Sequence, residues 1–237
     1  MVKVGVLALQ GDFEAHGRVL RGLGAEVREV RRCAELDDLA GLVIPGGEST
    51  ALLELMRGAP WFDAIRALHD RGGALLGTCA GAILLARRVA PEQPSLGLLD
   101  IAVARNGYGR QAESFEAAVD ADSFIGAFSG FFIRAPRIQE VGAEVTVLAR
   151  VDGEPVAVRC GRTLAATFHP ELTGSTALHR LFLELAATDA GGGAALNRRA
   201  ALAKRVAAGG GSGGSEPPRL LGDVPPQFDK KARINAL

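Results

Sequence analysis

The stretch Gly77-Thr78-Cys79-Ala80-Gly81 constrains the fold of this chain more than any other. An apolar run precedes it at 73–76, and a second apolar run follows it at 82–86. This order predicts a strand, a sharp turn and a helix. A turn of this kind needs small residues two places to either side of its central residue, because larger side chains would clash where strand and helix meet.

Cys79 stands at the centre of this predicted turn. The turn would push its sulfur into the open, and the first N–H groups of the following helix would favour its thiolate. The residue is then a nucleophile. The alternative is a small buried cysteine that packs as a hydrophobe, which is the commoner role of a free cysteine. The stretch alone leaves both interpretations open.

The composition narrows the class of protein. The chain has 237 residues with 27 basic and 27 acidic side chains, so nothing indicates binding to nucleic acid or to a membrane surface. No apolar run approaches the roughly 20 residues of a membrane span, and the N-terminus lacks a signal-peptide cleavage pattern. The cysteines (Cys33, Cys79 and Cys160) form no CxxC pair, so neither a metal site nor a disulfide framework is indicated. We expect a cytoplasmic protein.

The order of predicted elements indicates an α/β fold. Strands are expected at 2–9, 25–30, 41–44 and 73–76, and they alternate with helices at 13–23, 49–56 and 60–72. This alternation predicts a parallel sheet wrapped by helices. Asp12 is expected to cap the first helix with its side chain.

The middle of the chain differs, because short strands follow one another with turns between them. We expect these strands at 98–104, 115–119, 130–134, 145–151, 155–160 and 163–168, with a hairpin turn at Asp152-Gly153. They are expected to extend the same sheet with antiparallel members, and a helix follows at 175–187. The expected fold is a three-layer α/β/α sandwich around a mixed, mainly parallel sheet.

The composition changes after residue 187. Residues 188–237 are rich in Gly, Ala and Pro, which is the composition of a flexible linker or a disordered tail. We expect the folded domain to span 1–187 and the tail to lie outside it.

A cysteine nucleophile needs a base and a group that orients the base. Among the four histidines, His169 stands at the end of a predicted strand, where open α/β sheets place their sites. Pro170 favours an extended conformation at His169, so that Glu171 would lie beside the imidazole and fix its tautomer. The alternative for His169 is a lone surface histidine. Packing or surface roles are expected for the three histidines within predicted helices: His16, His69 and His179.

Donors for an oxyanion are also available. The segment 45–49 places two adjacent glycines at another strand end, where their N–H groups can approach a substrate closely. The N–H of Ala80, directly after Cys79, would be a second donor. An ordinary turn is the alternative interpretation of 45–49.

Taken together, the segments 45–49, 77–81 and 168–171 resemble those of the class I (triad-type) glutamine amidotransferases. The resemblance covers about residues 1–187. Further segments are similar to the glutaminase subunits of pyridoxal 5′-phosphate synthases: 9–12, 105–111, 114–115, 132–136 and 169–173. Tyr108 stands where Phe is more usual, and Ala166-Thr167 where Ser or Cys is common, but neither departure affects the three catalytic motifs.

The resemblance implies a role for each residue. Cys79 would attack the side-chain amide of glutamine, His169 would activate it and protonate the departing ammonia, and Glu171 would orient His169. Gly47 and Ala80 would donate to the oxyanion. The implied glutamine-binding residues are Gly47, Glu48, Ser49, Arg105, Ile133 and Arg134. A zwitterionic substrate needs such charges, although the arginines could equally be solvated charges at strand edges.

The implied activity is hydrolysis of L-glutamine to L-glutamate and ammonia through a cysteinyl thioester, with no cofactor and no metal. The ammonia would pass to a separate (β/α)₈ synthase subunit that builds pyridoxal 5′-phosphate, within a hetero-oligomeric lyase complex. The partner surface would lie near 10–16. The alternatives are an amidotransferase subunit for another acceptor, as in imidazole glycerol phosphate synthesis, a cysteine peptidase or esterase of related fold, and a non-catalytic regulatory subunit.

Overall fold

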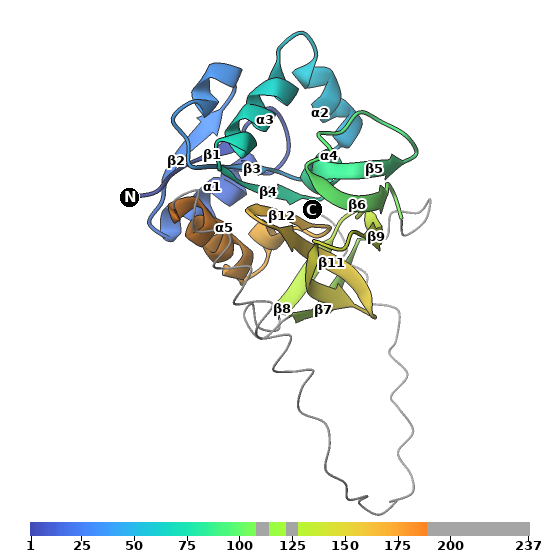
Figure 1. The fold of residues 1–237 in the computed structure, drawn as a ribbon. Coiled ribbons are helices and arrows are strands. Elements are labelled where there is room, and N and C mark those ends of the chain that lie inside the picture. Colours follow the sequence, from blue (N-terminus) through green and yellow to red (C-terminus); the bar gives the residue numbers. More distant parts are fainter. Residues whose placement is uncertain (108–113, 122–127, 189–237) are drawn as a thin grey trace, which may run out of the picture.

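The computed structural model describes residues 1–107, 114–121 and 128–188. A nine-stranded sheet with the order β2-β1-β3-β4-β12-β11-β10-β7-β8 forms its centre (Figure 1). The first five strands in this order are mutually parallel, and the remaining four are antiparallel. The parallel strands are β1 (Lys3–Leu7), β2 (Glu26–Val30), β3 (Gly41–Ile44), β4 (Ala74–Thr78) and β12 (Thr163–Ala166). The antiparallel strands are β7 (Phe115–Ala121), β8 (Phe128–Phe132), β10 (Thr146–Val151) and β11 (Glu154–Cys160). The predicted tail beyond residue 188 and the motif residues 108–111 lie outside the described residues.

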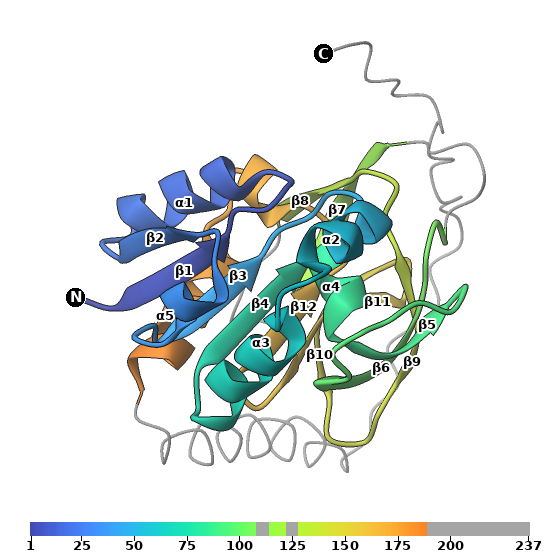
Figure 2. The same cartoon turned by 90° about the horizontal axis from the view of Figure 1, so that it is seen from above.

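Helices cover both faces of the parallel half of the sheet (Figures 1 and 2). One face carries α1 (Phe13–Gly22) and α5 (Ala177–Ala187), and the other carries α2 (Ser49–Met56), α3 (Trp61–Asp70) and α4 (Ala80–Leu85). Successive residues of β3 serve opposite faces, because Leu42 and Ile44 pack in one core cluster and Val43 packs in the other. The expected three-layer α/β fold is confirmed.

A second, three-stranded sheet corrects the expectation for the middle of the chain. It consists of β5 (Ala86–Ala90), β6 (Leu99–Ala104) and β9 (Arg137–Val141), in the order β5-β6-β9. The prediction that 98–104 joins the main sheet is therefore wrong, and neither β5 nor β9 was expected. Ile101, Val103 and Ile138 pack in the same core cluster as α4, so the small sheet covers part of one face of the main sheet.

Local details confirm some expectations and correct others. The Asp152-Gly153 turn has φ values of 50° and 81°, as the hairpin between β10 and β11 requires. Asp12 does stand at the N-cap of α1, but its side chain makes no capping hydrogen bond. The strand expected at 130–134 is β8, and Arg134, with φ at 46°, lies beyond its end.

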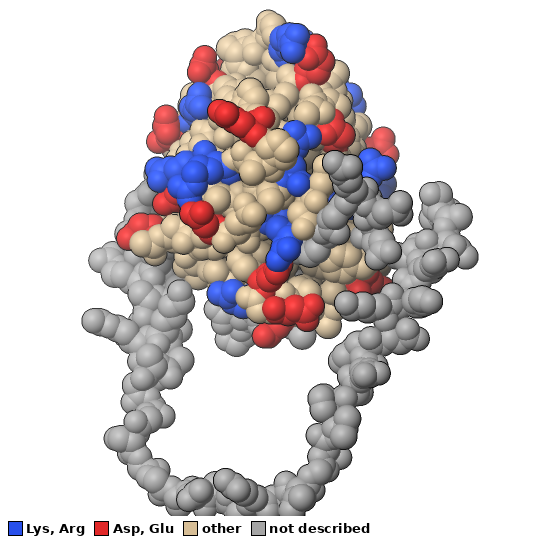
Figure 3. All heavy atoms as spheres, turned by 90° about the vertical axis from the view of Figure 1, so that its right-hand side faces the viewer, with Lys and Arg blue, Asp and Glu red and all other residues tan. Residues whose placement is uncertain are grey.

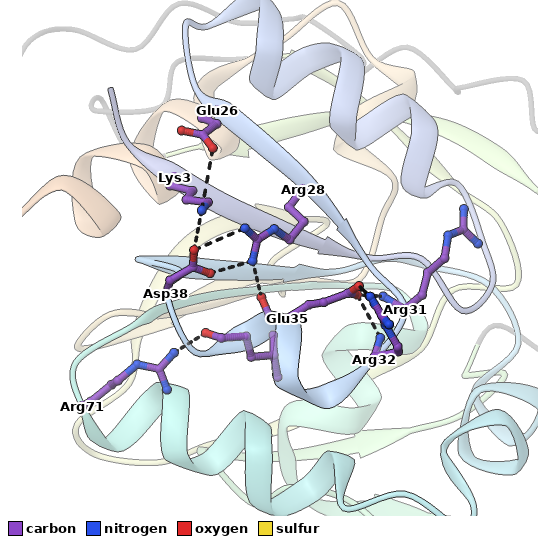
Figure 4. A network of polar contacts seen from close by, with 9 residues as sticks. Lys3, Glu26, Arg28, Arg31, Arg32, Glu35, Asp38 and Arg71 are labelled. Carbon is purple, nitrogen blue, oxygen red and sulfur yellow. Dashed lines mark hydrogen bonds and ion pairs between the residues drawn. The ribbon is translucent and has the colours of Figure 1, made fainter.

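Charged side chains lie on and beside β2, the edge strand of the main sheet (Figure 4). Arg28 donates to both carboxylate oxygens of Asp38, at 2.6 and 3.2 Å, and to the backbone carbonyl of Glu35 at 3.1 Å. Lys3 also donates to Asp38, and its Nζ lies 3.8 Å from Glu26 Oε1. The hydrogen bonds from Lys3 and Arg28 lower the pKa of Asp38 to about 2. Charges on an open strand edge oppose pairing with a second chain.

On the face shown in Figure 3, acidic and basic side chains are interspersed rather than gathered by sign. Of the helices that the structure describes, none is long and apolar enough to cross a bilayer.

Candidate active site

Cys79 occupies the predicted turn between β4 and α4. Its backbone is strained, with φ at 46° and ψ at −104°. A Cβ atom on Gly81 would lie 2.0 Å from the Ile44 carbonyl oxygen, and one on Gly77 would lie 2.5 Å from the Gly81 carbonyl oxygen. The glycines are therefore required by close backbone approach, as the sequence predicted.

Three neighbouring strands deliver the candidate catalytic groups to one edge of the sheet. Ile44, at the end of β3, pairs with Gly77, and Ala166, at the end of β12, pairs with Thr78. The segments that follow these strands therefore meet around Cys79. A Cβ atom on Gly46 would lie 2.4 Å from Cε1 of His169 and 3.2 Å from Cβ of Cys79.

His169 and Glu171 form a buried pair beside Cys79. His169 Nδ1 lies 2.7 Å from Glu171 Oε1, and the Glu171 side chain is fully buried. The contact was expected, but its predicted geometry was wrong, because Pro170–Leu172 form a 3₁₀ turn rather than an extended segment. The turn, and not a strand-like alternation, brings the carboxylate back to the ring.

The environment of His169 favours its charged form. Burial opposes the charge, but hydrogen bonds to the Cys79 side chain and to Glu171 outweigh burial and raise the pKa of His169 to about 10. An imidazolium placed between a sulfur and a carboxylate is the arrangement in which a cysteine attacks as its thiolate.

The turn at 45–49 is held by Gln10, a residue that the sequence did not assign to the site. Gln10 Nε2 donates to the Gly46 carbonyl at 3.4 Å, and its Oε1 accepts from the N–H of Glu48 at 3.2 Å. In a trans peptide the carbonyl and the N–H point in opposite directions. The N–H of Gly47 therefore points away from Gln10.

The expected glutamine-binding residues divide into two groups. Arg105 Nη2 lies 3.5 Å from Glu48 Oε1, so the second sheet brings Arg105 to the turn after β3. A hydrogen bond from Thr50 is the main cause that lowers the pKa of Glu48, which also caps α2 through the N–H of Ala51. Ser49 is buried and donates to Gln93 Oε1 at 3.0 Å.

The second group follows β8. The Ile133 carbonyl oxygen lies 3.8 Å from Cys79 Sγ, and Ile133 as a residue is 38% exposed. Arg134 is exposed next to it, in the left-handed backbone conformation. The structure thus places the Ile133 backbone at the sulfur.

Two further histidines lie near Glu171, on the side away from His169. For both of them the sequence predicted only a packing or surface role. His16 on α1 and His179 on α5 are both completely buried. His16 Nε2 lies 3.2 Å from Glu171 Oε2. The sequence signal for these two histidines was their position on the buried face of a predicted helix. This signal predicts that the side chain is buried but not which residue it contacts.

Ligand-type atoms of Asp12, His169 and Glu171 lie within 4.8 Å of one another. Two of these residues, His169 and Glu171, already bind each other through Nδ1 and Oε1 at 2.7 Å. The arrangement therefore suits acid–base chemistry better than a metal site.

Known proteins with similar sequences show the family of this chain. The model of the SNO glutamine amidotransferase family matches residues 6–188. The chain belongs to this family. Its sequence is 53% identical over 186 residues to "Pyridoxal 5′-phosphate synthase subunit PdxT" of Thermus thermophilus, a match that covers 77% of this chain and 97% of the relative. The protein of the same name from Deinococcus radiodurans is 51% identical over 193 residues, with coverage of 79% and 98%.

One solved structure agrees with the family assignment, and a more distant one shares the fold. A crystal structure described as a glutamine amidotransferase superposes with a TM-score of 0.73 at 50% identity, covering 78% of this chain and 99% of the other. A GMP synthase protein from Thermoplasma acidophilum, at 22% identity and a TM-score of 0.59, shares the fold. The match covers 79% of this chain and 94% of the other.

Proposed function

We propose that this chain is a glutaminase that hydrolyses L-glutamine to L-glutamate and ammonia, with Cys79, His169 and Glu171 as its catalytic triad. The observation that carries the proposal is the buried 2.7 Å pair of His169 and Glu171 beside a cysteine on a strained strand-to-helix turn. The family of glutamine amidotransferases, to which the chain belongs, supports glutamine as the substrate.

The reaction begins with attack of the Cys79 thiolate on the side-chain amide carbon. The carbonyl oxygen takes the negative charge, and the N–H groups of Gly47 and Ala80 donate to it. The His169 imidazolium then gives its proton to the leaving nitrogen, so that ammonia departs and a glutamyl thioester remains. His169, now neutral, takes a proton from water as the hydroxide adds to the thioester carbon. Collapse releases glutamate and restores the thiolate and the imidazolium.

Substrate selection is assigned to the charged groups around the turn after β3. Arg105 and Arg134 offer guanidinium groups to the α-carboxylate, and Glu48 offers a carboxylate to the α-ammonium group. We assign Gly47, Ser49 and the backbone of Ile133 to the remaining part of the glutamine site. The 3.5 Å contact between Arg105 and Glu48 supports this assignment, because it keeps two opposite charges side by side, one for each end of a zwitterion.

The relatives named as subunits of pyridoxal 5′-phosphate synthase support a partner for this chain. We assign the ammonia to a synthase subunit that makes pyridoxal 5′-phosphate, in a cytoplasmic hetero-oligomer with no role for nucleic acid. The partner surface is assigned to the exposed positions of 10–16, since Gly11, Asp12 and Glu14 are exposed and His16 is not. No cofactor is needed for the hydrolysis itself.

Ammonia release from L-glutamine tests the proposal. The full chain and its Cys79→Ala variant are assayed with and without a synthase subunit. We expect release that depends on Cys79 and increases with the synthase subunit. Equal release by wild type and Cys79→Ala would refute the triad. Activation by an imidazole glycerol phosphate synthase partner alone would favour the other acceptor, and turnover of peptides or esters without glutamine turnover would favour a peptidase or esterase.

A further inference from the structure

The two buried histidines behind the triad form a continuous polar path to it. His179 Nε2 lies 2.9 Å from His16 Nδ1, and His16 Nε2 lies 3.2 Å from both Thr78 Oγ1 and Glu171 Oε2. Glu171 Oε1 then meets His169. His16 comes from α1 and His179 from α5, so two helices far apart in sequence supply groups to one point beneath Cys79.

The protons in this path can be assigned from their surroundings. A carboxylate only accepts hydrogen bonds, so a lone pair on His16 Nε2 would face Glu171 Oε2 unfavourably. His16 therefore carries its proton on Nε2. Its Nδ1 is then an acceptor, and His179 Nε2–H is the donor that faces it.

The other end of the path agrees with this assignment. His179 Nδ1 has no hydrogen-bond partner among the described residues. With the proton on Nε2, this atom is an unpaired acceptor, which buried sites tolerate better than an unpaired N–H. The opposite tautomers would leave a buried N–H without a partner.

Both rings are neutral in this environment. Burial lowers the pKa of His16 well below its usual value, and the nearby His179 and His169 add to the effect. Burial also lowers the pKa of His179 to about 4. Because both rings are neutral, neither His16 nor His179 brings a positive charge to Glu171. The negative charge of Glu171 therefore interacts with the imidazolium of His169.

We propose that His16 and His179 are positioning residues of the catalytic site: His179 fixes the tautomer of His16, and the Nε2–H of His16 holds Glu171 Oε2 so that Oε1 stays aimed at His169. Glu171 Oε2 is buried and makes no hydrogen bond in the described part of the chain; the His16 approach at 3.2 Å lies within ion-pair distance but does not have hydrogen-bond geometry in this structure. An apolar side chain at position 16 would remove the polar N–H that faces this buried carboxylate oxygen, and Glu171 would turn toward other donors. The inference rests on the proposed roles of Cys79, His169 and Glu171.

Paired substitutions test the role of His16. His16→Leu replaces the imidazole with an apolar side chain and so removes the donor. His16→Gln can place an N–H near the position of Nε2. With the synthase subunit present, we expect His16→Leu to lower kcat for ammonia release by about 10- to 100-fold, with little change in KM for glutamine. His16→Gln should recover most of the loss. The matched control is His69→Leu on α3. Within the described part of the chain, the His69 ring makes a polar contact with its neighbour Asp70 alone, at 3.2 Å, so this variant should keep the kcat of the wild type.

A measurement without turnover tests the tautomers directly. With nitrogen-15-labelled histidine, long-range proton–nitrogen correlation spectra of the wild-type chain report which ring nitrogen carries the proton, and the His16→Gln spectrum assigns the signals. We expect neutral Nε2–H rings for His16 and His179. A proton on Nδ1 of His16, or wild-type kcat in a folded His16→Leu variant, would overturn the proposal.

These outcomes distinguish a failure of the roles proposed for His16 and His179 from a failure of the proposed glutaminase function. If His16→Leu does not fold, the spectra and the His16→Gln kinetics still decide, because a Gln variant as inactive as Cys79→Ala would also contradict a donor role. Wild-type chain without Cys79-dependent ammonia release would instead contradict the proposed function, while the tautomer assignment would stand or fall on the spectra alone.

Discussion

Gly46→Ala is the substitution for which the structure gives the sharpest expectation. The added Cβ would lie 2.4 Å from Cε1 of His169 and 3.1 Å from its Nδ1. Ordinary van der Waals contact begins near 3.4 Å, so the ring or the turn must move by about 1 Å. The backbone of Gly46 needs no left-handed conformation, since its φ is not positive, and the effect is therefore one of space alone.

The ring has little freedom to accommodate this methyl group. Its Nδ1 is held by Glu171 at 2.7 Å, and the backbone N–H of His169 donates to the Phe131 carbonyl at 2.9 Å. A displacement of about 1 Å between reacting groups costs about 100-fold in rate. We therefore expect Gly46→Ala to lower kcat for ammonia release by about 100-fold. Overpacking should also reduce the free energy of unfolding by about 1–3 kcal/mol.

The assay is steady-state ammonia release with the synthase subunit present, together with thermal unfolding of the free chain. Gly22→Ala is the matched control, because a Cβ at this exposed helical glycine meets nothing within 4 Å. It should keep wild-type kcat and gain up to about 1 kcal/mol in stability. A kcat of Gly46→Ala within threefold of wild type would refute the packing argument for His169.

Three further outcomes are expected. The pKa of His169 is raised from 6.5 to about 10, so its charge stabilises the fold fully below pH 6.5 and progressively less up to pH 10. The Tm difference between wild type and Glu171→Gln, measured by calorimetry, should therefore shrink as the pH rises over this range. A difference that stays constant would contradict the pairing of His169 with Glu171. Arg105→Ala should raise KM for glutamine about 10-fold or more with a smaller change in kcat, whereas Arg88→Ala, which removes an exposed pair with Glu140, should leave KM unchanged in the same assay. A chain ending at residue 188, where the family match ends, should keep the kcat of the full chain, and a large loss would show that the tail belongs to the catalytic unit.

The sequence predicted the centre of the site because parallel strands have a simple rule. Motifs at the ends of β3, β4 and β12 had to meet if these strands were neighbours, and they are. The glycines around Cys79 predicted the sharp turn for a steric reason that holds in any fold. Glu171 was paired with His169 correctly, although the 3₁₀ turn that joins them was not visible in the pattern.

The misses are contacts between distant segments. The contact of His16 with His179 joins residues 163 positions apart, and the helical pattern of each segment says only that one face is buried. Gln10 is a polar residue in a loop, and nothing local indicates that it grips the turn at Gly46. Of the second sheet, only β6 was expected as a strand, and it was assigned to the main sheet because the alternation of a strand reveals its faces but not which sheet it joins.

The hydrogen bond from the His169 N–H to the Phe131 carbonyl has a consequence for the assembly state of the protein. β8 is the last strand in the order of the main sheet, and Phe131 lies in it. This bond gives β8 a partner besides β7, and a strand at the end of a sheet could otherwise pair with another chain. The segment that positions the catalytic histidine thus also terminates the sheet. We expect substitutions that displace this segment to cost solubility together with activity, whereas the opposite edge, β2, is protected by its own charges and needs no such cover.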